Sequence, residues 1–171
     1  IAYFSFVFPG IQFPYHKHVS VFGNFASGME FPMMVNDGSA GTRKGMVSVT
    51  SHEIAHTYFP FMTGINERKY AWMDEGWASL LPHTLVERLT EGYDYFSLRV
   101  KSYESNAGKE GELPPMVLSY TNKTKPRTAA YDRPAVAYNE LYKYYMSGLE
   151  AHSTYYWKVV VDDGAGNKSE S

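Results

Sequence analysis

Five consecutive residues constrain the fold of this chain more than any other feature. His52, Glu53 and His56 form an H-E-x-x-H motif, and the apolar residues around it predict a buried helix from Met46 to Phe59 that ends at Pro60. Residues i and i+4 lie one turn apart on the same helix face, so both imidazoles can reach one metal ion. A neighbouring carboxylate can then take a proton from the attacking water. The competing interpretation is two surface histidines with a salt-bridging glutamate.

Glu75 supplies a third candidate ligand. Eighteen residues separate it from His56, and it lies in the segment from Trp72 to Ala78. A turn and a second, antiparallel helix would bring Glu75 back to the two histidines, and Gly76 would let the second helix approach the first closely. Two imidazoles and one carboxylate leave the fourth position of a zinc ion open for water, which is the arrangement of a catalytic site. The sequence therefore predicts one zinc ion per chain, bound by His52, His56 and Glu75.

The composition is that of a globular chain without cysteine. It has 171 residues, 44% of them hydrophobic and 20% charged, which suits one folded domain with a sizeable core. The net charge of -2 argues against a nucleic-acid-binding surface. The absence of cysteine excludes disulfides, thiolate zinc sites and cysteine nucleophiles. The first apolar run, Ile1 to Pro9, is too short to span a bilayer and lacks the flanks of a signal peptide, so we expect no transmembrane segment.

Hydrophobic periodicity and chain-breaking residues predict the remaining elements. Residues 1–35 are expected to be β-rich. Loops are expected over residues 36–45 and 106–128. Three further helices are expected: from near Met73 to Leu89 with a kink at Pro82, over 94–105, and from Ala129 or Pro134 to Met146. The expected fold class is α+β, mainly helical with a small β-sheet.

Three segments together resemble a known family. H-E-x-x-H, the eighteen-residue spacing and Trp72-Met73-Asp74-Glu75-Gly76 resemble the aminopeptidase-N-like family of gluzincin zinc metallopeptidases. Gly28-Met29-Glu30-Phe31-Pro32 resembles that family's G-x-M-E-N motif, which lies on an edge strand. Tyr131-Asp132-Arg133-Pro134 is similar to the Y-x-K-G or Y-x-K-P stretch that carries the family's catalytic tyrosine, with arginine in place of lysine. The resemblance covers residues of about 12 to 146.

The resemblance implies a fold, an activity and residue roles. It implies a thermolysin-like α+β catalytic domain that removes N-terminal residues from peptides, with Glu53 as the general base. Tyr131 would donate a hydrogen bond to the oxyanion, where charge develops. Glu30 would bind the free α-amine of the peptide substrate, and Gly28 and Met29 would line the substrate strand and the first side-chain pocket. Cleavage would thereby be restricted to the first residue.

The resemblance also divides the chain. Such enzymes usually carry a β-sandwich domain before the catalytic domain and a large helical domain after it, so we interpret residues 1–146 as a partial zinc peptidase domain. Residues 147–171 form a β-type tail that resembles the last two strands of a fibronectin type III domain, with a β-type run from Tyr155 to Val161. This adhesive-like tail and the lack of cysteine slightly favour an extracytoplasmic or secreted location.

Two other functions remain open. A zinc endopeptidase is favoured if Glu30 lies far from the metal. A catalytically silent binding or assembly fragment is the alternative from a different class, because the flanking domains do not fit in the chain. The sequence does not indicate the oligomeric state or the preferred first residue of the substrate.

Overall fold

The structure is a computed structural model that describes residues 1–23, 27–110, 112–115, 127–148, 160–162 and 168–170. It is an α+β fold in which helices prevail over strands, as the sequence predicts. The chain divides into two compact units, Ile1–Leu141 and Tyr142–Ser171. All the candidate site residues belong to the first unit.

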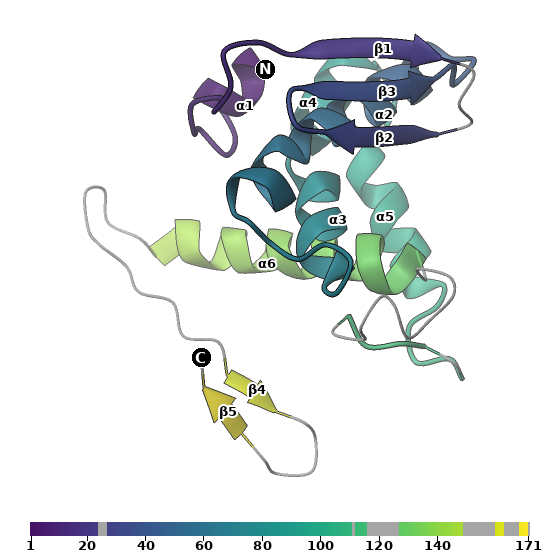
Figure 1. Ribbon diagram of the computed structural model, residues 1–171. Coiled ribbons are helices and arrows are strands. Elements are labelled where there is room, and N and C mark those ends of the chain that lie inside the picture. Colours follow the sequence, from purple (N-terminus) through teal and green to yellow (C-terminus); the bar gives the residue numbers. More distant parts are fainter. Residues whose placement is uncertain (24–26, 111, 116–126, 149–159, 163–167, 171) are drawn as a thin grey trace. The chain divides into compact units, whose positions relative to one another are not determined.

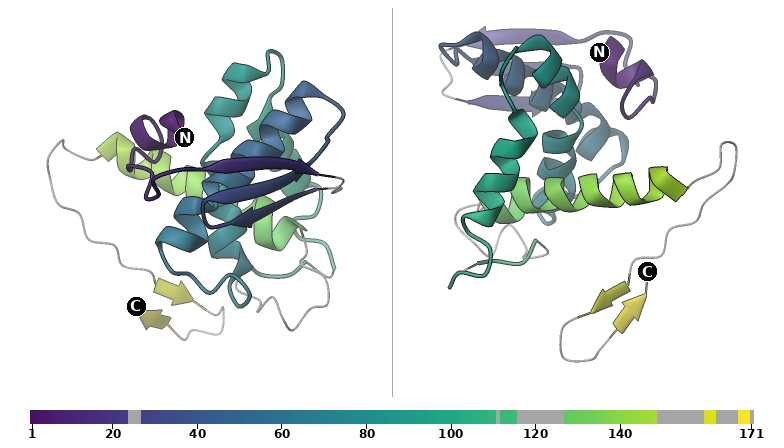
Figure 2. Two further views of the ribbon diagram at one scale, coloured as in Figure 1. Left: turned by 45° about the horizontal axis from the view of Figure 1, so that its top comes forward. Right: turned by 180° about the vertical axis from the view of Figure 1, so that it is seen from behind.

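The first unit contains one three-stranded sheet made of β1 (Val19–Gly23), β2 (Gly28–Phe31) and β3 (Met34–Gly38). Its strand order is β1-β3-β2, with β1 parallel and β2 antiparallel to β3. The strand β2 is therefore an edge strand, which is where the G-x-M-E-N resemblance expects Glu30. Figures 1 and 2 show the helices gathered on one face of this sheet, and α2 packs against β2 and β3.

Eight helical segments are present in the described residues. They are α1 (Ala2–Phe6), α2 (Arg43–Ala55), η1 (Thr57–Met62), α3 (Ala71–Leu80), α4 (His83–Leu89), α5 (Tyr95–Glu104), η2 (Thr128–Asp132) and α6 (Arg133–Gly148). The segment η2 is a short stretch of wider, π-helical turns, whereas η1 is kinked at Phe59, whose φ of -135° and ψ of 110° are not helical. The expected helix over 94–105 and the one starting near Pro134 are confirmed.

The zinc-motif helix begins earlier than its hydrophobic pattern predicts. The hydroxyl of Thr42 accepts a hydrogen bond from the backbone N–H of Gly45 at 3.2 Å, so Thr42 caps the helix and α2 starts at Arg43 rather than Met46. The loop expected over 36–45 is correspondingly shorter, because β3 continues to Gly38. Cap chemistry, which is independent of apolar periodicity, decides where α2 starts, and the pairing of β3 with β1 and β2 decides where the loop begins.

The strands β1 and β2 lie in the region expected to be β-rich, but two details of the expected elements differ. The chain opens with the short helix α1, within the region predicted to be β-rich, because Tyr3 and Phe4 are buried against Tyr58. The expected kinked helix over 73–89 is instead two helices, α3 and α4, and Pro82 occupies the N-cap of the second. Proline is favourable at the start of a helix, where its missing N–H is not needed, and unfavourable in the interior.

Gly76 permits a close helix approach, but to a different partner from the one expected. A Cβ atom at this position would lie 2.7 Å from Cβ of Pro134 and 2.9 Å from Cε2 of Tyr138. Both residues belong to α6, so the glycine brings α3 against α6 rather than against α2. The predicted partner was wrong.

The core that supports the zinc motif is aromatic and alanine-rich. Ala55, Tyr58, Ala78 and Leu81 are at most 1% exposed and pack together with Phe4. This cluster joins the end of α2, the turn η1 and the helix α3. It therefore fixes the two elements that carry the candidate ligands relative to each other.

The second unit contains β4 (Val160–Asp162) and β5 (Lys168–Glu170), which pair antiparallel. Most of the predicted run from Tyr155 to Val161 lies outside the described residues. The resemblance of this tail to a fibronectin type III fragment stays a prediction. Across the described residues, the helices are too short or too polar to cross a membrane.

Candidate metal centre

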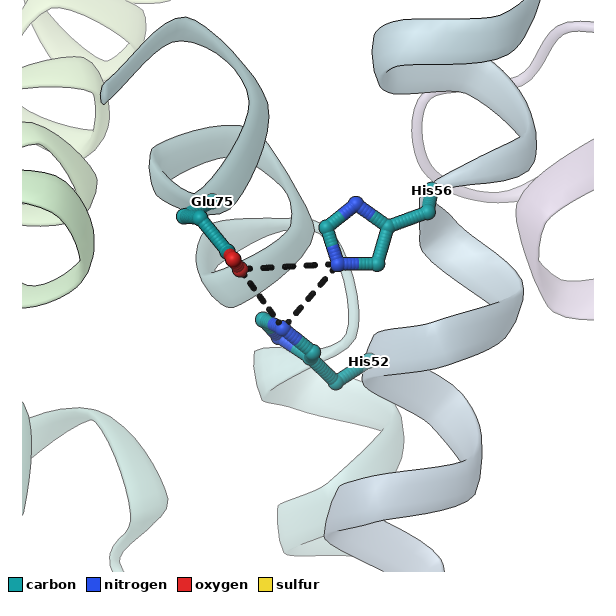
Figure 3. A group of neighbouring side chains, drawn as sticks. All are labelled: His52, His56 and Glu75. Carbon is teal, nitrogen blue, oxygen red and sulfur yellow. Dashed lines mark hydrogen bonds and ion pairs between the residues drawn. The ribbon is translucent and has the colours of Figure 1, made fainter. Parts of the chain in front are cut away.

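Three side chains converge between α2 and α3. His52 lies in the last turn of α2, His56 is the C-cap residue of the same helix, and Glu75 lies in α3. The two Nε2 atoms are 3.2 Å apart. Oε2 of Glu75 lies 3.1 Å from Nε2 of His52 and 3.5 Å from Nε2 of His56. Figure 3 shows the three groups pointing at one common centre.

The spacing of these atoms fits a metal ion. A tetrahedral zinc ion with ligand bonds of about 2.0–2.1 Å holds its ligand atoms about 3.3–3.4 Å apart. The three distances of 3.1, 3.2 and 3.5 Å scatter around that value. These residues could therefore hold a metal ion, and the predicted convergence of His52, His56 and Glu75 is confirmed.

Asp74 contacts the imidazole of His56 at the ring nitrogen that faces away from the other candidate ligands. Its Oδ1 lies 2.5 Å from Nδ1 of His56, and the carbonyl oxygen of Phe59 lies 3.1 Å from the same nitrogen. Both partners accept hydrogen bonds, so Nδ1 carries the proton and the lone pair of Nε2 points towards the other ligands. In contrast, Nδ1 of His52 is buried without a hydrogen-bond partner among the described residues. The sequence indicated Asp74 only as part of a motif, and no sequence signal pointed to its contact with His56.

Glu53 points from α2 towards β2. Its side chain is buried, with 6% of the residue exposed. A Cβ atom at Gly28 would lie 2.2 Å from Oε1 of Glu53, so only glycine lets the edge strand come this close. Burial raises the pKa of the Glu53 carboxyl to about 8, and the neighbouring carboxylates of Glu30 and Glu75 act in the same direction.

Glu30 lies on the edge strand β2 and reaches the surroundings of His56. One of its carboxylate oxygens, one ring nitrogen of His56 and one oxygen of Asp74 all lie within 4.8 Å of one another. The structure thus brings Glu30 next to a candidate ligand, although 26 positions separate it from His56. Its neighbour Met29 is 40% exposed.

Tyr131 reaches the centre from η2. Its hydroxyl donates a hydrogen bond to Oε1 of Glu75 at 2.6 Å. Its ring stacks on His52, with centroids 5.9 Å apart and an interplanar angle of 19°. Burial and the adjacent Glu75 raise the pKa of the Tyr131 phenol, so its proton stays available for donation.

One cavity of about 480 Å³ joins these groups. All eight predicted site residues line it: Gly28, Met29, Glu30, His52, Glu53, His56, Glu75 and Tyr131. Sequence reasoning did not assign the other seven lining residues, which are Ser48, Val49, Ser27, Tyr93, Tyr95, Arg99 and Arg127. The position of Ser48 and Val49 one turn before the motif could have indicated the first two, whereas no sequence signal pointed to the others.

Comparisons with protein-family models, with curated proteins and with solved structures gave no match. The function of the chain is therefore inferred from the geometry of this site and from the motifs themselves.

Proposed function

We propose that this chain is the catalytic portion of a zinc-dependent aminopeptidase of the aminopeptidase-N-like kind, with a thermolysin-like fold. The observation that carries the proposal is the convergence of His52, His56 and Glu75 beside Glu53 in one cavity. Two imidazoles and a carboxylate form a ligand set for a catalytic zinc ion. Glu30 and Glu75 also place carboxylates in this cavity, and a divalent cation would offset their negative charge.

Each residue of the cavity has a defined task in this proposal. The chemistry that zinc supplies when bound is a lowered pKa of the attacking water and polarisation of the scissile carbonyl. Glu53 accepts the proton of that water at its carboxylate and passes it to the leaving amine. For this task the carboxyl of Glu53 must be ionised. The positive charge of a bound zinc ion would lower its pKa and so oppose the effect of burial. Tyr131 donates its hydroxyl proton in a hydrogen bond to the oxyanion.

Glu30 supports removal of terminal residues rather than internal cleavage. A carboxylate a few ångströms from His56 and Asp74 can pair with the cationic amine of a peptide, and such a pair is favourable in a partly enclosed cavity. An endopeptidase would leave this charge without a partner. The proximity of Glu30 therefore favours the aminopeptidase over the endopeptidase.

The first experiment measures metal content and turnover in matched variants. We expect His52→Ala to lose stoichiometric zinc and Glu53→Gln to keep zinc but lose hydrolysis of an aminoacyl chromogenic substrate, because an amide cannot accept the proton. His16→Ala, an exposed histidine outside the cavity, is the control and should match the parent. Near-stoichiometric zinc in His52→Ala would overturn the ligand assignment. Zinc binding without turnover in the parent would instead favour a silent binding fragment.

The second experiment tests the amine anchor. Glu30→Ala should reduce the cleavage of peptides with a free amine far more than that of N-acetylated peptides. Glu104→Ala, an exposed glutamate at the end of α5, serves as the control. Equal cleavage of free and acetylated peptides by the parent would contradict the anchor role and support an endopeptidase.

A further inference from the structure

The cavity also contains two arginines, Arg99 and Arg127, for which the proposed reaction has no use. They come from α5 and from the residue before η2, far from the zinc motif in the sequence. Positive side chains in a cavity that already holds three glutamates call for an explanation. Their contacts show which of the two charges is free to act on a ligand.

Arg99 is a fixed charge in the cavity wall. It is 8% exposed, and its Nη1 donates to Oδ1 of Asp132 at 3.0 Å. Its Nη2 donates to the hydroxyl of Tyr95, and the guanidinium lies 4.6 Å from the centroid of that ring. These contacts hold the side chain in one position.

Arg127 is much more accessible. Its side chain is 70% exposed, and its Nε lies 3.8 Å from Oδ2 of Asp132, too far for a hydrogen bond. The same Asp132 oxygen accepts a hydrogen bond from Ser102 at 2.7 Å. One buried carboxylate thus faces two guanidinium groups, which leaves a net positive charge at this wall of the cavity.

This positive wall lies close to the metal ligands. The guanidinium of Arg127 lies 5.6 Å from the centroid of the Tyr131 ring, and that ring lies 5.9 Å from the ring of His52. Arg127 is therefore within about 12 Å of His52, a span of about three residues of extended peptide. Glu30, in contrast, lies close to His56 and Asp74. The candidate amine anchor Glu30 is thus next to His56, whereas Arg127 is on the side of Tyr131 and His52.

We propose that Arg99 and Arg127 form a subsite for a carboxylate of the bound peptide, either its C-terminal carboxylate or an acidic side chain shortly after the cleaved bond. This inference rests on the proposed function only in taking the ligand to be a peptide. Arg127 contacts the carboxylate and Arg99 supplies a fixed charge behind it, because guanidinium groups bind carboxylates in a planar, charge-assisted geometry. The subsite would select short or acidic peptides by an attraction at the end away from the amine.

The test measures binding, so it does not depend on turnover. Isothermal titration calorimetry is carried out on the full chain with Glu53→Gln, loaded with zinc, using four peptides. Ala-Ala-Ala with a free C-terminus is compared with Ala-Ala-Ala amide, and Ala-Ala-Glu amide with Ala-Ala-Gln amide, because the subsite lies about three residues from His52. We expect the carboxylate member of at least one pair to bind about tenfold more tightly than its neutral counterpart, and this ratio to fall as salt is added. The first pair reports a terminal carboxylate and the second an acidic side chain.

Added to the same background, Arg127→Gln should reduce the ratio to about one, and Arg127→Lys should restore part of it, because lysine keeps the charge but not the planar fork. Arg68→Gln, an exposed arginine outside the cavity, should leave the ratio unchanged. Lack of discrimination in both pairs, lack of binding by all four peptides, or discrimination that survives Arg127→Gln would each overturn the subsite. Charge-dependent binding by a chain whose parent form hydrolyses nothing would support the subsite and refute the peptidase proposal, so the two failures are distinguishable.

Discussion

Replacement of Asp74 by asparagine isolates the contribution of one buried hydrogen bond to metal binding. Asp74 is fully buried, and its Oδ1 lies 2.5 Å from Nδ1 of His56. Asparagine keeps the shape and the acceptor oxygen but removes the negative charge that makes Nε2 a stronger ligand. Groups that orient a metal-binding histidine typically contribute about 10- to 100-fold to metal affinity.

We expect Asp74→Asn to weaken zinc binding about tenfold, which is about 1.4 kcal/mol. Asp74→Ala should weaken it more, towards about a hundredfold, although the carbonyl oxygen of Phe59 still accepts from the imidazole at 3.1 Å. Competition with a chromogenic zinc chelator measures the dissociation constants. Asp132→Asn is the control, because Asp132 is similarly buried, at 1% exposed, but bonds Arg99 and Ser102. A zinc dissociation constant of Asp74→Asn within about twofold of the parent value would refute the reasoning.

Three further substitutions test the surroundings of the centre. Gly28→Ala would place a Cβ 2.2 Å from Oε1 of Glu53 and displace that carboxyl group. We expect kcat to fall about a hundredfold with zinc affinity retained, because displacing a general base by about 1 Å can cost that much. A kcat equal to that of the parent would contradict this. The Cβ atom of Gly76→Ala would lie 2.7 Å from Cβ of Pro134. Overpacking should destabilise the fold by about 1–3 kcal/mol, which exceeds the gain of about 1 kcal/mol from alanine in a helix. We therefore expect a lower Tm in thermal unfolding, and a higher Tm would argue against the close contact. Tyr131→Phe should keep the fold and zinc but lower kcat by about 100- to 1000-fold, the usual loss for one oxyanion donor; a loss of zinc instead would show that the hydroxyl acts by holding the ligand Glu75.

Local spacing in the sequence correctly predicted that His52, His56 and Glu75 converge. Two histidines four positions apart share a face of any α-helix, so their convergence needs no knowledge of the rest of the chain. Glu75 required one more assumption, a return of the chain by an antiparallel helix. The core of Ala55, Tyr58 and Ala78 packs α2, η1 and α3 together and so brings α3, which carries Glu75, back to the helix of the two histidines.

The sequence was less informative where several weak signals compete. It predicted the α+β class, but it missed the cap that starts α2 and the opening helix α1, and it predicted a kink at Pro82 where the helix breaks in two. Each of these depends on a single residue or on burial against a distant partner. Apolar periodicity averages over a window and does not register such effects.

Only the tertiary structure decided what surrounds the three ligands. The hydroxyl of Tyr131 meets Glu75 across 56 positions of sequence, and Arg99 meets Asp132 across 33. Gly76 could have faced either neighbouring helix, and it lies against Pro134. The physical reason is that the geometry of one helix follows from short-range backbone hydrogen bonds, whereas the choice of neighbours depends on how all buried surfaces pack at once.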